Sequence, residues 1–392
     1  MSATREFDWP EAQWFERIAM IAGCAGVAGC ALGAVLRLDL FFHSYLFAFT
    51  SWLAIALGSL AIWMIHNLTG GYWGLVLRRF LEAATRTLPF LLLAFLPIAF
   101  MLPDIYPWAR SGNPGETLEH NPRPEYLNVP FFLIRAGVYF ACWLIIAFFL
   151  NRWSRQQDHT ADPETEQRMH GLSGPGLVIY GMTVTFAAID WIMSLQPNWS
   201  STIFGAIVAT GQMLPALALA IAFATWFASR PPLRELVTPD IWNDLGNLLL
   251  AFVMLWTYMM FSQLLLIWSG NLPEEITWYL VRIEGGWLWV GVLLAVFYFA
   301  LPFLLLLSRD IKREPRRLRI VALTVVAMSF VHQYWMIAPV FSPEEVYRFW
   351  MDIAAFVGLG GFWMFCFFWQ LQTRPLIPLH LPAQQEEVAH HA

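Results

Sequence analysis

Residues 45–65 read YLFAFTSWLAIALGSLAIWMI, an apolar run that contains no acidic or basic side chain. A transmembrane helix needs about 20 consecutive, mostly apolar residues, so this run alone predicts one. Similar runs lie near 18–36, 45–65, 88–103, 129–150, 176–195, 203–229, 247–268, 286–307, 320–337 and 349–371. The sequence therefore predicts a chain that crosses a membrane about ten times.

The composition of the whole chain agrees with that prediction. Hydrophobic residues make up 58% of the 392 residues, charged residues only 13%, and the mean hydropathy is +0.54. Soluble domains contain about 25% charged residues, so a soluble globule is excluded. We expect an all-α polytopic integral membrane protein forming one membrane domain over 1–392, with an N-terminal tail at 1–17 and a polar C-terminal tail at 375–392.

Basic residues predict the orientation. If the ten spans are right, 17 arginines and lysines fall on one side of the membrane and 6 on the other. The positive-inside rule then places both termini in the cytoplasm and the 269–285 loop outside. The acidic start, with Glu6, Asp8 and Glu11, lacks the basic region of a cleavable signal peptide, so the first span should remain. The basic run 309–319 favours contact with anionic lipid over nucleic acid.

Two segments outside the runs interrupt the apolar pattern. Arg78, Glu82 and Arg86 recur at steps of four and share one helix face, which predicts a helix at the membrane interface. The stretch 151–175 is rich in Gly, Pro and charge and is expected to be a loop.

Redox cofactors are not expected on this chain. The four cysteines, Cys24, Cys30, Cys142 and Cys366, lie in apolar runs, with no C-x-x-C-H or iron–sulfur spacing. His66 and His332 would lie at different depths, so they do not make a haem pair. We predict no metal and no redox centre.

Ionisable side chains inside the apolar runs are the first functional candidates, because a carboxylate in hydrocarbon costs about 2.5–3.5 kcal/mol on insertion scales. In the predicted topology Asp190, Asp352 and His332 share one layer in the outer half of the membrane, and Arg348 lies one turn from Asp352. Such groups form proton paths. The alternatives are a structural hydrogen-bonded Asp190, a neutralising Arg348–Asp352 pair and a core histidine at His332.

A second set lies at the inner start of the seventh span. Asp240, Asp244 and Asn247 open the helix there, where carboxylates favour the helix dipole, so capping is the preferred interpretation. The weaker alternative is the cytoplasmic mouth of a proton path that begins at Asp244 and continues through Tyr258.

Two stretches carry a resemblance to a known family. IDWIMSLQPNWSSTIFG at 189–205 and FSQLLLIWSGNLPEEITWYLVRIEGGW at 261–287 are similar to the second quinone-binding membrane subunit of bacterial alternative complex III, a quinol:cytochrome c oxidoreductase; this subunit belongs to the polysulfide reductase-like membrane family. Supporting pieces are the run from Phe42 to Gly74, RRFLEAATRTLP from Arg78 and LPFLLLLSRDIKR from Leu301. The resemblance covers most of the chain. Tyr298 stands where the family pattern has histidine, and His332 where aspartate is common.

The resemblance implies a fold of two four-helix bundles, at about 42–197 and 201–338, with flanking helices and a last span at 349–371. It implies a bacterial inner-membrane complex that oxidises quinol and passes electrons through iron–sulfur clusters and c-type haems in partner subunits to cytochrome c or a terminal oxidase. A sister membrane subunit holds the better-supported quinol site. For this chain, proton conduction, with Tyr298 beside the residues above, and scaffolding are favoured over quinone contact.

The external loop 270–286 would then face the haem and iron–sulfur subunits. Pro273, Glu274, Glu275 and Trp278 are the predicted partner contacts, and the alternative is a rigid turn packed on its own bundle. Two other classes of function remain open: a secondary transporter, for which Pro97 and Pro215 could supply helix breaks, and a purely structural anchor for peripheral subunits.

Overall fold

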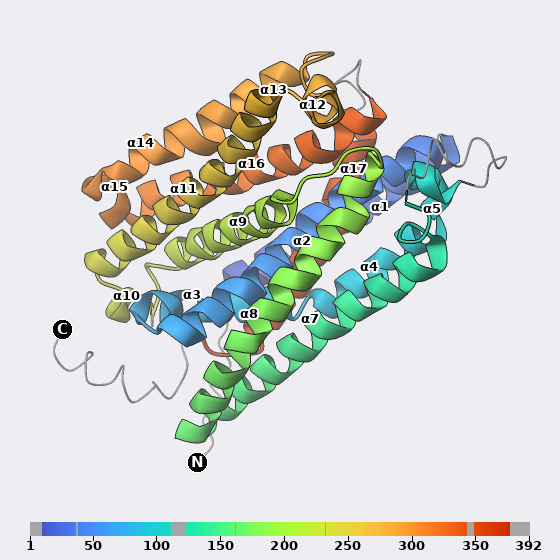
Figure 1. Ribbon diagram of the computed structural model, residues 1–392. Helices are drawn as coiled ribbons and strands as arrows, with labels where there is room; N and C mark the ends of the chain where they lie inside the picture. The colour runs from blue at the N-terminus through green and yellow to red at the C-terminus, as the bar shows by residue number, and fades with distance from the viewer. Residues whose placement is uncertain are drawn as a thin grey trace.

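The computed structural model describes residues 10–36, 38–110, 123–160, 162–231, 233–342 and 349–376, all of them in helices or the turns between them. Ten helical segments in this part of the chain are long and apolar enough to cross a membrane, so the protein is a polytopic helical membrane protein (Figure 1). The segments are α1 (Pro10–Leu36), α2 (Leu38–Thr69), α3 (Tyr72–Thr85) with α4 (Leu88–Phe100), α7 (Val129–Gln157), α8 (Pro163–Trp191), α9 (Phe204–Trp226), α11 (Pro239–Gly270), α13 (Trp287–Leu294) with α14 (Leu301–Leu307), α16 (Pro315–Phe341) and α17 (Phe349–Gln372). The ten predicted crossings are confirmed.

Short elements mark the two ends of the helix bundle. One end, the α3 side, holds α3, α10 (Leu233–Leu236) and α15 (Arg309–Arg313) (Figure 1). The other end, the α12 side, holds α5 (Leu102–Ile105) and α12 (Pro273–Leu280), with the 3-10 turns η1 (Pro107–Ala109) and η2 (Met193–Leu195) in the connections there.

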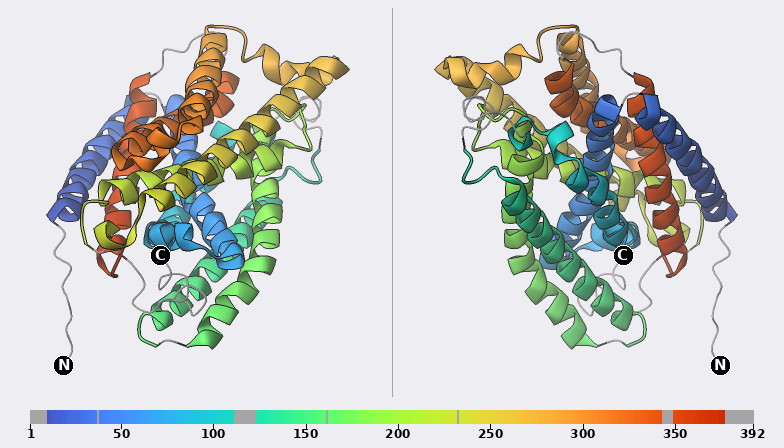
Figure 2. Two further views of the ribbon diagram at one scale, coloured as in Figure 1. Left: turned by 90° about the vertical axis from the view of Figure 1, so that its left-hand side faces the viewer. Right: turned by 90° about the vertical axis from the view of Figure 1, so that its right-hand side faces the viewer.

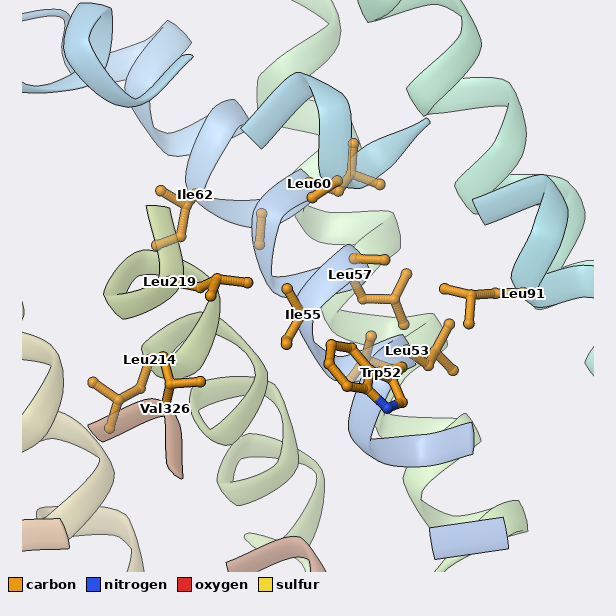
Figure 3. Packing of buried hydrophobic residues seen from close by; sticks show 14 of the residues in the cluster. Trp52, Leu53, Ile55, Leu57, Leu60, Ile62, Leu91, Leu214, Leu219 and Val326 are labelled. Atoms are coloured by element: carbon orange, nitrogen blue, oxygen red, sulfur yellow. The ribbon is translucent and has the colours of Figure 1, made fainter. Parts of the chain in front are cut away.

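Helix α2 forms the centre of the molecule. The most apolar part of this helix is buried in full, as expected for a helix that is hydrophobic on all sides. Figure 3 shows Trp52, Leu53 and Leu57 of α2 among side chains of α4, α9 and α16. At Gly58 a Cβ would lie 1.9 Å from the Gln212 carbonyl oxygen, so only glycine permits the approach of α2 to α9. Packing against α2 therefore joins the two halves of the chain.

Helix contacts divide the other spans into two groups. Helices α4 and α8 pack with α2, and α7 packs with α4 and α8; helices α11, α14 and α16 pack with α9 or with one another, with α13 against α16. We call α2, α3 with α4, α7 and α8 the first bundle, and α9, α11, α13 with α14, and α16, with the short segments at α12 and α15 packed on them, the second bundle. The contact between α2 and α9 then places the bundles side by side.

The first and last spans pair outside the two bundles. Figure 2 shows α1 in blue beside α17 in red, at the edge of the molecule. A Cβ on Gly26 would lie 2.2 Å from the Gly358 nitrogen, and one on Gly361 would lie 2.3 Å from the Gly23 nitrogen. Small residues let membrane helices approach backbone to backbone, so this pair is held by close van der Waals packing.

Two sequence predictions need correction on the α3 side. The expected interfacial helix is α3, but every residue from Gly74 to Thr85 is buried, so its charges face protein rather than water. The expected loop 151–175 is largely helical, because α7 continues to Gln157 and α8 begins at Pro163. Helices α7 and α8 therefore extend beyond the apolar runs that predicted them.

Candidate functional site

Asp190 lies in an ion pair inside the first bundle. Its two carboxylate oxygens accept hydrogen bonds from Nε and Nη2 of Arg135 on α7, each at 2.8 Å. The Tyr139 hydroxyl, one turn further along α7, donates to Oδ2 at 2.8 Å. Asp190 is 0% exposed and Arg135 is 8% exposed. The carboxylate is thus balanced by a bidentate arginine, the strongest kind of charge-assisted pair.

This ion pair is anchored to the edge of the bundle on the α12 side. Arg135 Nη1 donates to the Tyr126 carbonyl at 2.9 Å, and the guanidinium carbon lies 3.9 Å from the centre of the Tyr126 ring. Burial and the nearby Asp190 carboxylate raise the pKa of Tyr126 above its usual range. A chain of polar groups therefore leads from the buried Asp190 to the turn before α7. The sequence analysis did not single out Arg135, although an arginine inside an apolar run is the signal that identifies it.

His332 lies in a different environment, among aromatic rings of the second bundle. Its ring centre is 5.0 Å from that of Trp256 on α11 and 6.0 Å from that of Tyr298. Tyr298 belongs to the π-helical segment η3 (Ala295–Ala300) between α13 and α14. Such segments interrupt the regular helix and are frequent at functional sites. His332 Nε2, Tyr298 Oη and Trp256 Nε1 are all buried and have no hydrogen-bond partner among the described residues.

Arg282, in the turn after α12, lies at the end of this aromatic cluster. Its guanidinium donates to the carbonyls of Trp335, Trp278 and Met336 at 3.2, 2.7 and 2.6 Å. The Trp335 carbonyl would normally accept from the residue four positions later, but Pro339 has no N–H. Arg282 supplies the missing donor. Its charge also lies over the Trp278 ring, 3.6 Å from the ring centre.

No carboxylate balances the Arg282 charge in the hydrogen bonds and ion pairs of the described residues, although the side chain is 2% exposed. Burial lowers the pKa of Arg282 to about 9, at which the guanidinium still carries its charge at neutral pH. Among the described residues, backbone carbonyls and tryptophan rings are the groups that stabilise this cation.

Asp352 lies in a third environment, at the start of α17. The Tyr334 hydroxyl of α16 donates to Asp352 Oδ2 at 3.1 Å. Both residues border a cavity of about 380 Å³ that is otherwise apolar, with Phe47, Phe330 and Phe356 in its wall. Arg348, the predicted partner of Asp352, lies outside the described residues, so their predicted pairing stays a prediction.

The three predicted proton-path residues are thus held by three separate sets of partners. Asp190 contacts Arg135 and Tyr139, His332 contacts aromatic rings, and Asp352 contacts Tyr334. A cavity of about 20 Å³ lies between the bundles and is lined in part by Thr50, Gln212 and Gln333. A space of this size with polar walls can hold one water molecule.

The inner set, Asp244 and Tyr258, lies on the outer face of α11. Asp244 is exposed, and Tyr258 is 64% exposed within a membrane span. This position faces the surroundings of the bundle, away from any path along its interior. Asp240 lies in the first turn of α11, as predicted for a carboxylate that favours the helix dipole, but it makes no capping hydrogen bond; its Oδ1 accepts from Arg313 at 2.7 Å.

The predicted docking loop is a short helix, α12, followed by a turn. Pro273 and Glu274 are exposed, and Glu275 is half-buried, with its carbonyl accepting from Trp199 Nε1 at 3.0 Å. Trp278 is buried, with its ring stacked 5.3 Å from that of Trp199. Trp278 therefore attaches α12 to its own bundle, and the prediction that it contacts a partner does not fit its burial. Only Pro273, Glu274 and part of Glu275 remain available to a partner.

A second charged cluster surrounds Glu82 of α3. It lies inside the protein on the α3 side, where the sequence predicted a helix at the membrane interface. Glu82 is 0% exposed and accepts from Arg78 Nε at 2.8 Å, Arg79 Nη1 at 2.7 Å and Arg374 Nη1 at 2.9 Å. The Ser154 hydroxyl of α7 donates to Oε1 at 2.5 Å. One carboxylate thus joins α3, α7 and the segment that directly follows α17.

Asp158, at the end of α7, completes the cluster. It accepts from Arg79 Nη2, so Glu82 and Asp158 together face three arginines. The steps of four between Arg78, Glu82 and Arg86 could not distinguish this buried cluster from a surface helix, because its other members are distant in the sequence.

The described residues contain no group of three His, Cys, Asp or Glu side chains that could hold a metal ion. Comparison with known proteins adds no identification. No family model matches the chain, and no curated protein matches it.

Proposed function

We propose that this chain is a membrane subunit of a respiratory quinol oxidoreductase of a bacterial inner membrane. It carries no redox centre of its own and contributes a proton path and a scaffold. The resemblance of residues 189–205 and 261–287 to the second quinone-binding membrane subunit of alternative complex III supports the assignment. The observation that carries the mechanistic part is the fully buried carboxylate of Asp190, linked through Arg135 to the α12-side edge.

The chemistry of a proton path fits this arrangement. A carboxylate accepts a proton when its ion pair loosens, and Arg135 has a second acceptor in the Tyr126 carbonyl toward the α12 side. Movement of the guanidinium toward that acceptor would leave the Asp190 carboxylate with only the Tyr139 hydroxyl, and a proton would take the place of the cation. Return of Arg135 would then expel the proton. Asp190 acts here as the proton carrier, and Arg135 as the group that controls its protonation.

Orientation and partners form part of the proposal. Both termini lie in the cytoplasm, as the 17-to-6 distribution of basic residues favours, so the α12 side faces outward. The exposed Pro273 and Glu274 would contact the haem c and iron–sulfur subunits there. The sister membrane subunit and a terminal oxidase are the other proposed partners.

Membership of a complex is tested first. The tagged chain is purified from its native membrane in mild detergent, and a reduced-minus-oxidised spectrum is recorded with a quinol oxidation assay. Bands of c-type haem with quinol activity are expected. A colourless chain recovered alone, from cells shown to make the other subunits, would contradict the assignment and favour a transporter.

The proton path is tested by Asp190→Asn, with Glu284→Gln as a control that removes an exposed carboxylate on the α12 side. Assembly and quinol oxidation should persist in both, while the proton-to-electron ratio in vesicles should fall only in Asp190→Asn. Tyr139→Phe keeps the ion pair and serves if Asp190→Asn fails to assemble. An unchanged ratio in every assembled variant would leave scaffolding as the role of this chain.

Quinone contact is the second candidate, favoured by the 380 Å³ cavity beside Asp352. Its size and apolar wall suit a quinone ring, and Ile353 in the wall is 54% exposed, so the cavity reaches the outer face. Met328→Trp would fill the cavity and should raise the KM for quinol, with Leu304→Trp, on an exposed position of α14, as the control. Equal KM values in both variants would remove quinone from this cavity.

A further inference from the structure

A large cavity with basic walls opens on the α3 side, between α4, α7 and the end of α17. Its volume is about 630 Å³. Arg86, Arg152, Arg155 and Arg374 line it together with His159, and its lining contains no acidic residue. The cavity therefore combines space for a sizeable ligand with a marked excess of positive charge.

Three of these arginines are not neutralised within the described part of the protein. Arg86 Nη1 donates to the side-chain oxygens of Gln370 and Thr373, at 3.1 and 3.0 Å, and neither acceptor is charged. Arg152 and Arg155 are exposed and have no ion pair among the described residues. Arg374 differs, because its Nη1 binds the buried Glu82. The cavity thus presents three guanidinium groups to an external anion.

The wall formed by α7 changes character along one face of the helix. Leu144 and Phe148 are followed at helical spacing by Arg152 and Arg155, all on the wall of the cavity. Phe148 is 59% exposed, and Pro89 of α4 is a second exposed apolar group in the cavity wall. The apolar part lies toward the middle of the span and the arginines at its end. This is the polarity profile of a membrane lipid, with acyl chains below a charged headgroup.

We propose that this cavity binds one anionic phospholipid. The phosphate lies among Arg86, Arg152 and Arg155, and acyl chains follow Leu144 and Phe148. Basic pockets between transmembrane helices are suited to such headgroups. A free phosphate ion would use the arginines but not the apolar part of the wall, which Pro89, Leu144, Ala147 and Phe148 form. The site is independent of the proposed respiratory function, because it requires only the geometry of α4, α7 and α17.

The alternative is that these arginines only mark the end of a span at the bilayer surface. The test compares Arg152→Gln plus Arg155→Gln with Arg168→Gln plus Arg234→Gln, which removes two exposed charges of α8 and α10 on the same side, outside both the cavity and the basic run 309–319. Each protein is purified as the assembly in which it occurs, delipidated and titrated with phosphatidylglycerol or phosphatidylcholine. Bound lipid is counted by native mass spectrometry.

Wild-type protein and the control variant should each retain phosphatidylglycerol at least about 10-fold more tightly than phosphatidylcholine, and the cavity variant should lose this preference. Leu144→Trp, which fills the apolar part and keeps all charges, should also displace the lipid. Equal retention of both lipids by wild-type protein, or equal losses in the two arginine variants, would overturn the proposal. Full competition by millimolar inorganic phosphate would reduce the site to a general anion site and overturn the lipid assignment.

Discussion

The two bundles bury polar groups in opposite ways. In the first bundle each buried charge faces an opposite charge, Asp190 with Arg135 and Glu82 with three arginines. In the second bundle the buried charges of the described residues are Arg282, whose partners are backbone carbonyls and tryptophan rings, and Lys312, whose Nζ donates to the Asn247 side-chain oxygen; neither has a carboxylate partner. His332 Nε2 and Tyr298 Oη are buried there without hydrogen-bond partners among the described residues. The interior of the first bundle is therefore stabilised by pairs of opposite charges. The interior of the second is stabilised by packing around polar groups that have few hydrogen-bond partners.

The difference predicts where mutations destabilise and where they change function. A matched buried pair becomes an uncompensated charge when one partner is removed, at a cost of about 3–5 kcal/mol. A buried polar group without a partner has little to lose, because its desolvation is already unfavourable in the native state. Four experiments examine this contrast, in order of decreasing expected effect.

Glu82→Gln should be the most destabilising single change, by about 3–5 kcal/mol or more, because it leaves Arg78, Arg79 and Arg374 without their shared carboxylate. Thermal unfolding in detergent measures the loss. The control is Glu164→Gln, which removes the exposed i,i+4 pair with Arg168 and should change stability by less than about 0.5 kcal/mol. Similar effects of the two changes would mean that the Glu82 cluster is not a structural centre.

A double-mutant cycle on Asp190→Asn and Arg135→Gln should give the next largest effect. Each single change leaves a buried group without its partner, whereas the double variant removes both charges. The double variant should therefore be more stable than the sum of the single losses predicts, by at least about 2 kcal/mol. Additive losses, measured by the same unfolding assay, would show that the two groups are not coupled.

The ten crossings were accessible from the sequence because each depends on a local property, the length of an apolar run. The burial of α3 was not accessible. Arg78 and Glu82 have the same spacing whether they face water or protein, and the choice is made by Ser154, Asp158 and Arg374 from distant segments. For the same reason Asp190 could be found alone, but its partner Arg135, 55 residues away, could not be assigned.

The direction in which a side chain points was a second feature that the sequence could not predict. Tyr258 was predicted to continue a proton path through the bundle and Trp278 to contact a partner, yet Tyr258 points outward from α11 and Trp278 points into the bundle. The apolar run around Tyr258 has no polar face that would fix its rotation. Trp278 is turned inward by stacking on Trp199, which is distant in the sequence and outside the helical repeat of α12; Arg282, four residues after Trp278, lies over its ring.

Arg282→Lys examines the second bundle. Lysine keeps the charge but cannot donate to three carbonyls in a fixed fork, so the carbonyl freed by Pro339 should lose its donor. We expect a loss of about 2–3 kcal/mol and faster proteolysis near α12. Arg282→Met, which also removes the uncompensated charge, should be no worse than Arg282→Lys. If the methionine variant is much less stable, the positive charge itself stabilises the second bundle.

The smallest effects come from two tyrosines with contrasting hydroxyl groups. Tyr139→Phe removes a donor to the Asp190 carboxylate and should cost about 1.5–3 kcal/mol, whereas Tyr298→Phe removes a buried hydroxyl without a described partner and should cost less than about 0.5 kcal/mol or be stabilising. Stability and quinol oxidation are measured on both. A loss of turnover in Tyr298→Phe with unchanged unfolding would assign the buried Tyr298 hydroxyl of the π-helical segment to function. A stability loss as large as that of Tyr139→Phe would instead show that the second bundle satisfies its polar groups as the first does, and the contrast between the bundles would fail.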